Sequence, residues 1–104
     1  MKRFIQVAKL KPEMTGEYRR LHAAVWDDVV KTIKECNIKN YTISLDGNTA
    51  ISYFEYVGDD YEKDMAKMEA DPVTREWWKH TKPCFSGHDQ SVYYADCDEI
   101  FHLD

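Results

Sequence analysis

The chain contains few of the residues that interrupt or cross-link a fold. Its 104 residues include four glycines, three prolines and three cysteines. The cysteines, Cys36, Cys84 and Cys97, are odd in number and show no paired spacing. Such usage is typical of free thiols in a reducing compartment, so we predict a cytoplasmic protein. Nor does the sequence contain a glycine-rich phosphate loop.

Long apolar runs and an excess of positive charge are also missing. No apolar stretch approaches the ~20 residues of a membrane span. The beginning of the chain, "MKRFIQVAKLKP", has basic residues but no continuous apolar core, so we do not expect a secretory signal. The formal net charge of -5 is unfavourable for binding nucleic acid or an anionic membrane. We therefore expect neither as a partner.

The remaining composition is that of an ordinary globular domain. Hydrophobic residues make up 43% of the chain and charged residues 32%. The length fits a single domain over residues 1–104, and it is sufficient to bury a core without disulfides or structural metals.

Hydrophobic periodicity predicts the order β-α-β-β-α-β. We expect strands over residues 2–10, 38–45, 50–57 and 98–104, with a tight turn at "DGNT" between the second and third. A first helix is predicted over residues 15–35, with Thr15 as its N-cap. A split second helical region is predicted to begin at Asp59 or Asp60 and again at Asp71, and to end at Pro83; residues 84–97 are expected to form a loop.

This order is that of a ferredoxin-like α+β fold. Its antiparallel sheet carries the helices on one face, which leaves the other face without cover. In so small a chain the cover is often a second copy. We therefore expect a homodimer.

Three residues with polar tips recur at every fourth position of the first predicted helix. At ~100° per residue, Tyr18, His22 and Trp26 fall on the same side as the apolar Leu21 and Val25. A histidine in such a stripe can be a hydrogen-bonded core residue, or it can line a cavity as an acid–base group. The three aligned residues favour the cavity.

The pair Trp77–Trp78 in "REWWKH" permits two interpretations. Neighbours on a helix point about 100° apart, so the two rings are not expected to share one core contact. One ring can pack in the core and the other on a partner, or the pair can form a platform for a sugar ring. The sequence alone leaves both open.

A metal site is not expected. His80, Cys84 and His88 have spacing that metal ligands can have, but Pro83 interrupts the segment and no paired zinc motif is present. We therefore predict a protein without a metal.

Four stretches together resemble the L-rhamnose mutarotase family. They are "YRRLHAAVW" with its Tyr-x-x-x-His-x-x-x-Trp pattern, "NYTISLD", "DPVTREWWKH" with its tryptophan pair, and "EIFHLD". The resemblance covers essentially the whole chain. It implies a dimeric ferredoxin-like α+β barrel that interconverts the α and β anomers of L-rhamnose, or of a related 6-deoxy sugar, without metal or cofactor.

The resemblance also implies roles for five residues. His22 corresponds to the proton donor, and Tyr18, Tyr41, Trp77 and Trp78 correspond to residues that contact the sugar. The chemistry agrees, because ring opening of a sugar needs only positioned acid–base groups. A second group, or a water held by Tyr18 or Tyr41, could accept the hydroxyl proton.

Two other functions stay open at this point. One is a haem-handling or oxidative enzyme of the same dimeric ferredoxin-like architecture, with His22 as an iron ligand. The other is a non-catalytic interaction module that uses "REWWKH" as its partner surface.

Overall fold

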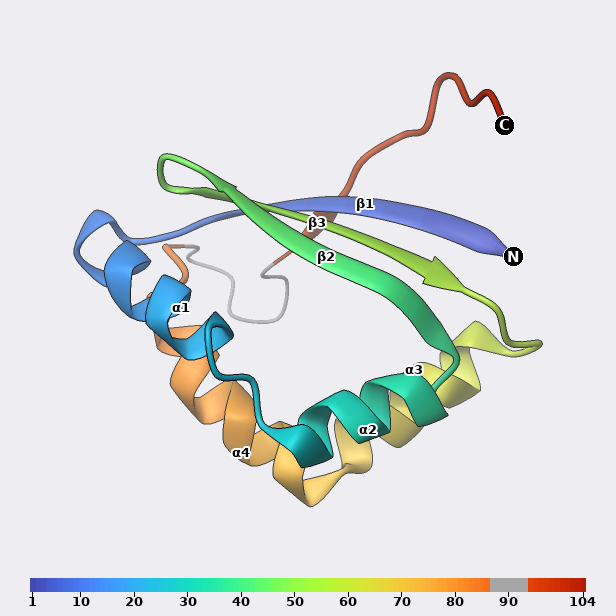
Figure 1. Cartoon of the computed structure of the whole chain (residues 1–104), viewed down its shortest axis with the longest axis horizontal. Helices are drawn as coiled ribbons and strands as arrows, with labels where there is room; N and C mark the ends of the chain where they lie inside the picture. The colour runs from blue at the N-terminus through green and yellow to red at the C-terminus, as the bar shows by residue number, and fades with distance from the viewer. Residues whose placement is uncertain (87–93) are drawn as a thin grey trace.

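A four-stranded antiparallel sheet forms one layer of the computed structural model, which describes residues 1–86 and 94–104. The order across the sheet is β2-β3-β1-β4. Figure 1 shows the sheet above the helices. The strands are β1 (Lys2–Lys9), β2 (Ile38–Asp46), β3 (Thr49–Tyr56) and β4 (Ala95–Asp96). The predicted hairpin of the second and third strands is confirmed, with Gly47 at a φ of 59° in its turn.

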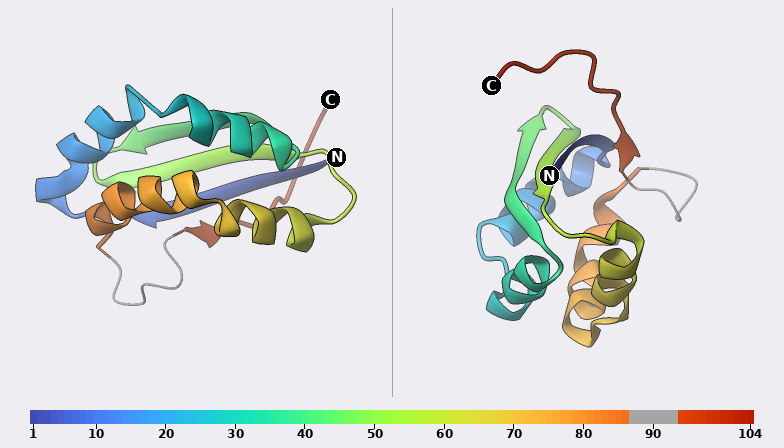
Figure 2. Two further views of the ribbon diagram at one scale, coloured as in Figure 1. Left: turned by 90° about the horizontal axis from the view of Figure 1, so that it is seen from below. Right: turned by 90° about the vertical axis from the view of Figure 1, so that its right-hand side faces the viewer.

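The helices of the described residues all lie on one face of this sheet (Figure 2). They are α1 (Thr15–His22), α2 (Asp27–Glu35), α3 (Tyr61–Ala70) and α4 (Pro72–Thr81), with short 3₁₀ turns at Pro12–Met14 and Lys82–Cys84. The predicted ferredoxin-like α+β fold is therefore confirmed. Within these residues, no helix is both long enough and apolar enough to cross a membrane.

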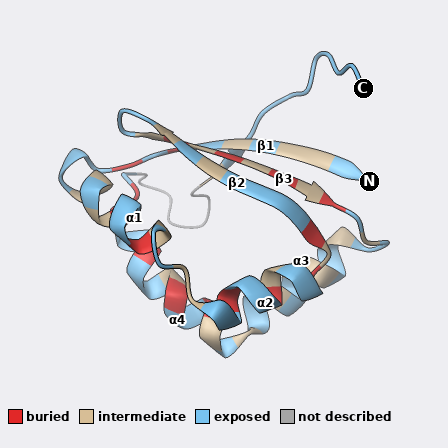
Figure 3. Ribbon diagram, viewed as in Figure 1, coloured by how far each residue is buried: buried red, intermediate tan, exposed pale blue. Residues whose placement is uncertain are grey.

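Burial along strand β3 shows most clearly which face of the sheet is covered by the helices and which is exposed. Ala50, Ser52, Phe54 and Tyr56 alternate with less buried residues and face the helices (Figure 3). Such a period of two is what a strand with one covered face requires. The helix-facing residues contribute to two separate groups of buried side chains.

We call these groups the first and second core clusters. The first lies around α1 and α4; its buried members are Ala8, Leu10, Tyr18, Leu21, Val29, Ala50, Trp77, Cys84 and Phe85. The second lies at the end of the β2–β3 pair where β2 begins and β3 ends, and it packs against α3; its buried members are Ile38, Phe54 and Tyr56. The candidate site lies at the first cluster.

Two of the three predicted helix caps are confirmed. Asp60 accepts the amide of Lys63 at the start of α3, at 3.1 Å. Asp71 accepts the amide of Thr74 at the start of α4, at 2.8 Å, and Pro72 follows it. The prediction for Thr15 is wrong, because Thr15 is already the first residue of α1 and its hydroxyl faces the Lys11 carbonyl and the Asn48 side-chain oxygen, both of which accept from it.

The prediction of one continuous helix over residues 15–35 is wrong. Residues 23–26 separate α1 from α2, and Trp26 has extended backbone angles, φ −64° and ψ 138°. The break places Trp26 against Trp77 of α4. It also puts Asp27 and Asp28 into the first turn of a new helix, where the helix dipole favours carboxylates.

The prediction of a last strand over residues 98–104 is also wrong. The strand at that edge is β4, which pairs with Gln6 and Val7 of β1. Residues 98–104 have no regular secondary structure and are exposed. Their alternating pattern suits a strand, but no strand of the described chain pairs with them. The predicted loop 84–97 lies partly outside the described residues, and its described part includes the end of the second 3₁₀ turn and β4.

Candidate functional site

The last turn of α1 holds His22 in a defined orientation. Its Nδ1 lies 2.8 Å from the backbone carbonyl of Tyr18, one helical turn earlier. A carbonyl oxygen can only accept, so Nδ1 carries the proton in that bond. The Nε2 atom is then the nitrogen left for a ligand. No described residue forms a hydrogen bond with it.

Aromatic rings surround the His22 imidazole. The Tyr18 ring lies 4.3 Å away between centroids, and the Trp77 ring lies edge-on at 5.6 Å. Trp26 in turn meets Trp77 at 5.2 Å and His80 at 5.5 Å. The structure thus brings Tyr18, His22 and Trp77 together, and the break between α1 and α2 keeps Trp26 beside Trp77.

A further phenol, which the sequence pattern did not single out, meets Tyr18. The hydroxyls of Tyr18 and Tyr94 lie 2.5 Å apart. Both rings stand edge-on to Phe85, each with a centroid distance of 5.5 Å. Tyr94 comes from a stretch without periodicity, directly before β4. No sequence pattern marks Tyr94 as a site residue, and its role is visible only in the folded structure.

Burial keeps the Tyr18–Tyr94 pair neutral. Loss of water around the hydroxyls raises the pKa of both residues, most strongly for Tyr18. Both phenols therefore keep their protons at neutral pH and act as hydrogen-bonding groups, not as bases.

Tyr41 reaches the same side of the sheet from β2. An irregularity of the β2–β3 pairing lies between Lys39 and Thr42, and the Tyr41 ring packs edge-on against Phe54. The side chain is 44% exposed. Its hydroxyl end, however, is surrounded by protein, and this burial raises the pKa of Tyr41 to about 12. Tyr41 also contributes to the raised pKa of Tyr18, after burial and Tyr94.

Ser52 of β3, close to Tyr41, has a buried hydroxyl without a well-aligned hydrogen bond. Ser52 is 1% exposed, and no described residue offers its Oγ a hydrogen bond of acceptable geometry. The nearby Tyr41 hydroxyl is the group to which Ser52 can donate, and this interaction opposes the rise in the pKa of Tyr41. A buried hydroxyl without a partner is costly, so it marks a place where a polar ligand or a water can be held.

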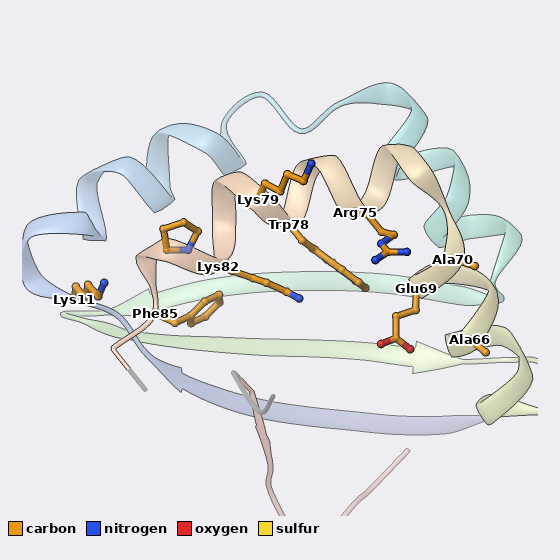
Figure 4. Close-up of a pocket in the computed structure, with 10 residues that line it drawn as sticks. Lys11, Ala66, Glu69, Ala70, Arg75, Trp78, Lys79, Lys82 and Phe85 are labelled. Atoms are coloured by element: carbon orange, nitrogen blue, oxygen red, sulfur yellow. The ribbon is translucent and has the colours of Figure 1, made fainter. Parts of the chain in front are cut away.

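Trp78 does not point toward His22. It projects from α4 toward the sheet and lines a surface pocket of about 880 Å³ (Figure 4). The Lys82 ammonium lies 4.9 Å from its ring centre. Phe85 lines the same pocket and also touches Tyr18, so the pocket lies one ring away from the Tyr18 hydroxyl. Cations dominate the remaining wall, which includes Lys11, Arg75 and Lys79.

The residues with metal-like spacing do not converge in the part of the chain that is described. His80 is exposed, whereas Cys84 is buried and donates its thiol to the His80 carbonyl at 3.7 Å. His88 lies outside the described residues. Within residues 1–86 and 94–104, no three His, Cys, Asp or Glu side chains gather as metal ligands would.

Comparison with known proteins gives a family match along nearly the whole chain. The family described as L-rhamnose mutarotase matches residues 3–103. An L-rhamnose mutarotase from Oceanobacillus iheyensis is 31% identical over 105 residues and is covered completely, as is this chain.

Two solved structures resemble the fold. The L-rhamnose mutarotase FA22100 from Formosa agariphila superposes with a TM-score of 0.80 at 19% identity, with both chains covered completely. The tetracenomycin F2 cyclase from Streptomyces glaucescens gives 0.68 at 12% identity, again with full coverage of both chains. At these identities the structures support the fold alone, and the second shows that the fold is also found in a polyketide cyclase.

Proposed function

The chain belongs to the L-rhamnose mutarotase family, and on that premise we propose that it interconverts the α and β anomers of L-rhamnose by acid–base chemistry. It is an isomerase-type enzyme that acts on a carbohydrate. The observation that carries the chemical proposal is the His22 imidazole, which is held by its Nδ1 and ringed by aromatic residues with Nε2 left for substrate.

His22 acts through Nε2. When Nε2 is protonated, it donates to the ring oxygen of the sugar while the C1–O5 bond breaks and the anomeric hydroxyl loses its proton. The open-chain aldehyde then rotates about the C1–C2 bond. The same steps in reverse close the ring on the other face of C1. Such general acid–base catalysis supplies about 10²–10⁴-fold acceleration.

We assign the phenols a role in binding the sugar, not in proton transfer. Their raised pKa values mean that Tyr18 and Tyr41 cannot serve as the base at neutral pH. The anomeric proton therefore passes to a bound water while the protonated Nε2 donates to the ring oxygen. Tyr18 and Tyr41 hold sugar hydroxyls or that water.

The tryptophans shape the remainder of the sugar site. Trp77 offers a ring edge-on to His22 and supports its orientation. Trp78 borders the neighbouring pocket. Apolar C–H faces of a sugar pack well on such rings. We propose that the sugar contacts both residues, with its reacting carbon at His22.

The haem-handling or oxidative alternative is not supported. The family match and the named relatives point to an isomerase. We propose that the reaction needs no metal or organic cofactor, because proton transfer alone accounts for it.

We propose a homodimer that covers the open face of the sheet. Ile5 and Val7 on that face are 46% and 36% exposed. The C-terminal segment leaves the sheet on the side opposite the helices (Figure 1) and exposes Ile100, Phe101 and Leu103 by 95%, 79% and 80%. Burying each of these side chains in a second copy would contribute about 1.5–3 kcal/mol.

The net charge of -5 leads us to propose further that the protein has no nucleic-acid partner.

The cysteines are all free thiols, which fits the cytoplasm.

The proposed reaction is tested by polarimetry. Freshly dissolved single anomers of L-rhamnose, L-fucose and D-glucose are followed with and without the protein. We expect strong acceleration for L-rhamnose, weaker acceleration for the other 6-deoxy sugar, and the least for glucose. If all three sugars relax at the buffer rate, the proposed function is wrong.

The dimer is tested by light scattering on wild type and on Phe101→Asp. We expect the mass of a dimer for wild type and a shift toward the monomer for the variant. An exposed-site control, Lys31→Asp on α2, should leave the mass unchanged. A monomeric wild type at micromolar concentration would contradict the dimer.

A further inference from the structure

Tyr94 is the residue outside the predicted site that contacts it most closely. Its hydroxyl lies 2.5 Å from that of Tyr18, and both rings meet Phe85 edge-on. These contacts fix the Tyr18 hydroxyl from the side of the sheet that β4 borders.

The chain anchors Tyr94 through the residues that follow it. Ala95 and Asp96 pair with Val7 and Gln6 of β1. The Asp96 carboxylate accepts the Gln6 amide at 2.7 Å, and the Cys97 amide donates to the Ile5 carbonyl at 2.8 Å. The backbone after Tyr94 is therefore tied to the sheet, which gives its phenol a defined position.

Two hydroxyls that are hydrogen-bonded to each other can form a limited number of further hydrogen bonds with a third group. One proton is used between them, so the pair keeps one outward donor proton and unused acceptor lone pairs. A sugar hydroxyl is also donor and acceptor at once, so it can complete this arrangement.

Resting on the proposed function, we propose that Tyr94 is a positioning residue for the reaction. Its hydrogen bond fixes the direction of the Tyr18 hydroxyl, and the pair binds one hydroxyl of the sugar as a unit. Without Tyr94, the Tyr18 hydroxyl turns freely, and the sugar loses an oriented partner. Binding therefore weakens more than the proton-transfer step slows.

The test compares Tyr18→Phe, Tyr94→Phe and the double variant. Exchange kinetics give kcat and KM for L-rhamnose, and tryptophan fluorescence gives a dissociation constant for the sugar without relying on turnover. We expect each single variant to raise KM and the dissociation constant about 3–10-fold, as for one lost hydrogen bond. The double variant should be no more than about twofold worse than either single variant, because the pair acts as a unit.

The matched control is Tyr53→Phe, which removes a phenol that donates to Glu55 at 2.6 Å on the opposite face of the sheet. It should leave both constants unchanged. Melting curves for all variants separate loss of fold from loss of binding.

Two results overturn the role of Tyr94 while wild type remains active. One is a KM for Tyr94→Phe within twofold of wild type. The other is a double variant whose effect is the product of the single effects. A wild type that neither binds nor exchanges L-rhamnose overturns the proposed function and this inference together.

Discussion

The two core clusters treat their buried polar groups differently. In the second cluster, the Tyr56 hydroxyl donates to the Asp64 carboxylate at 2.5 Å and accepts the Asp60 amide at 3.0 Å. The Asn37 amide donates to the same carboxylate oxygen at 2.9 Å. Each of these groups is satisfied within the chain. The network joins β3, the start of β2 and α3.

In the first cluster, hydrogen-bonding capacity is left over. Tyr18 and Tyr94 satisfy each other only partly, and beside them the Nε2 of His22 has no hydrogen-bond partner among the described residues. Unsatisfied buried polar groups cost stability, so a chain that retains them at one end of its sheet has another use for them. The comparison indicates that the second cluster maintains the fold and the first carries the chemistry.

The largest effect is expected for His22→Ala. Removal of the imidazole should lower the anomer exchange rate of L-rhamnose by at least about 100-fold, since general acid–base catalysis is lost. Saturation-transfer NMR measures the rate, and a melting curve confirms the fold. His80→Ala, which removes an exposed histidine from α4, is the control. Equal loss in the two variants would contradict the assignment.

The next effect separates the two neighbouring tryptophans. Trp77→Phe should raise KM for L-rhamnose about tenfold, because Trp77 contacts His22 and shapes the reacting end. Trp78→Phe should raise it only a few-fold, because its ring lines the neighbouring pocket. Steady-state kinetics on both variants measure the difference. A larger effect at Trp78 would move the reacting end of the sugar to that pocket.

A smaller effect, on stability alone, is expected in the second cluster. Tyr56→Phe removes the hydroxyl that Asp64 and Asp60 bind, so the melting temperature should fall by roughly 5 °C. The exchange rate per folded molecule should stay within twofold of wild type. Thermal melting and NMR exchange at a temperature where both proteins are folded measure the two quantities. A large loss of rate without a loss of stability would reverse the roles of the clusters.

The smallest effect is a change in alkaline stability. Burial and the Asp64 carboxylate raise the pKa of Tyr56 to about 12, above its ordinary value of 10. The protonated Tyr56 hydroxyl therefore stabilises the folded state. This contribution is complete at pH values below the pKa of the unfolded chain, and it is lost as the pH rises from about 10 to about 12. Between pH 9 and pH 11, urea midpoints should therefore fall more in wild type than in Tyr56→Phe. Parallel decreases would contradict the shift.

Much of this fold could be predicted from local signals. Asp60 and Asp71 begin helices by side-chain capping, and the "DGNT" turn joins two strands, because each feature depends on residues close in sequence. The helix break was missed because "AAVW" contains neither glycine nor proline. Tertiary contacts of Trp26 override its helical tendency, and Asp27–Asp28 was the available signal for a new helix start.

The site divides in the same way. Tyr18 and His22 could be predicted because both lie on one short helix at a spacing of four. Trp77 was expected, but its contact with His22 depends on how α1 and α4 pack. Tyr94 could not be found, since it meets Tyr18 only through the pairing of β4 with β1. The expected last strand failed because a strand pattern does not supply a partner strand.

A crystal structure of the protein with L-rhamnose bound tests the central claim most directly, because it shows which cluster receives the sugar. We predict that the ring oxygen lies within about 3 Å of the His22 Nε2. A sugar hydroxyl should also lie within hydrogen-bonding distance of the Tyr18–Tyr94 pair. A sugar bound elsewhere, with no group of the first cluster in contact with its reacting carbon or ring oxygen, would contradict the account.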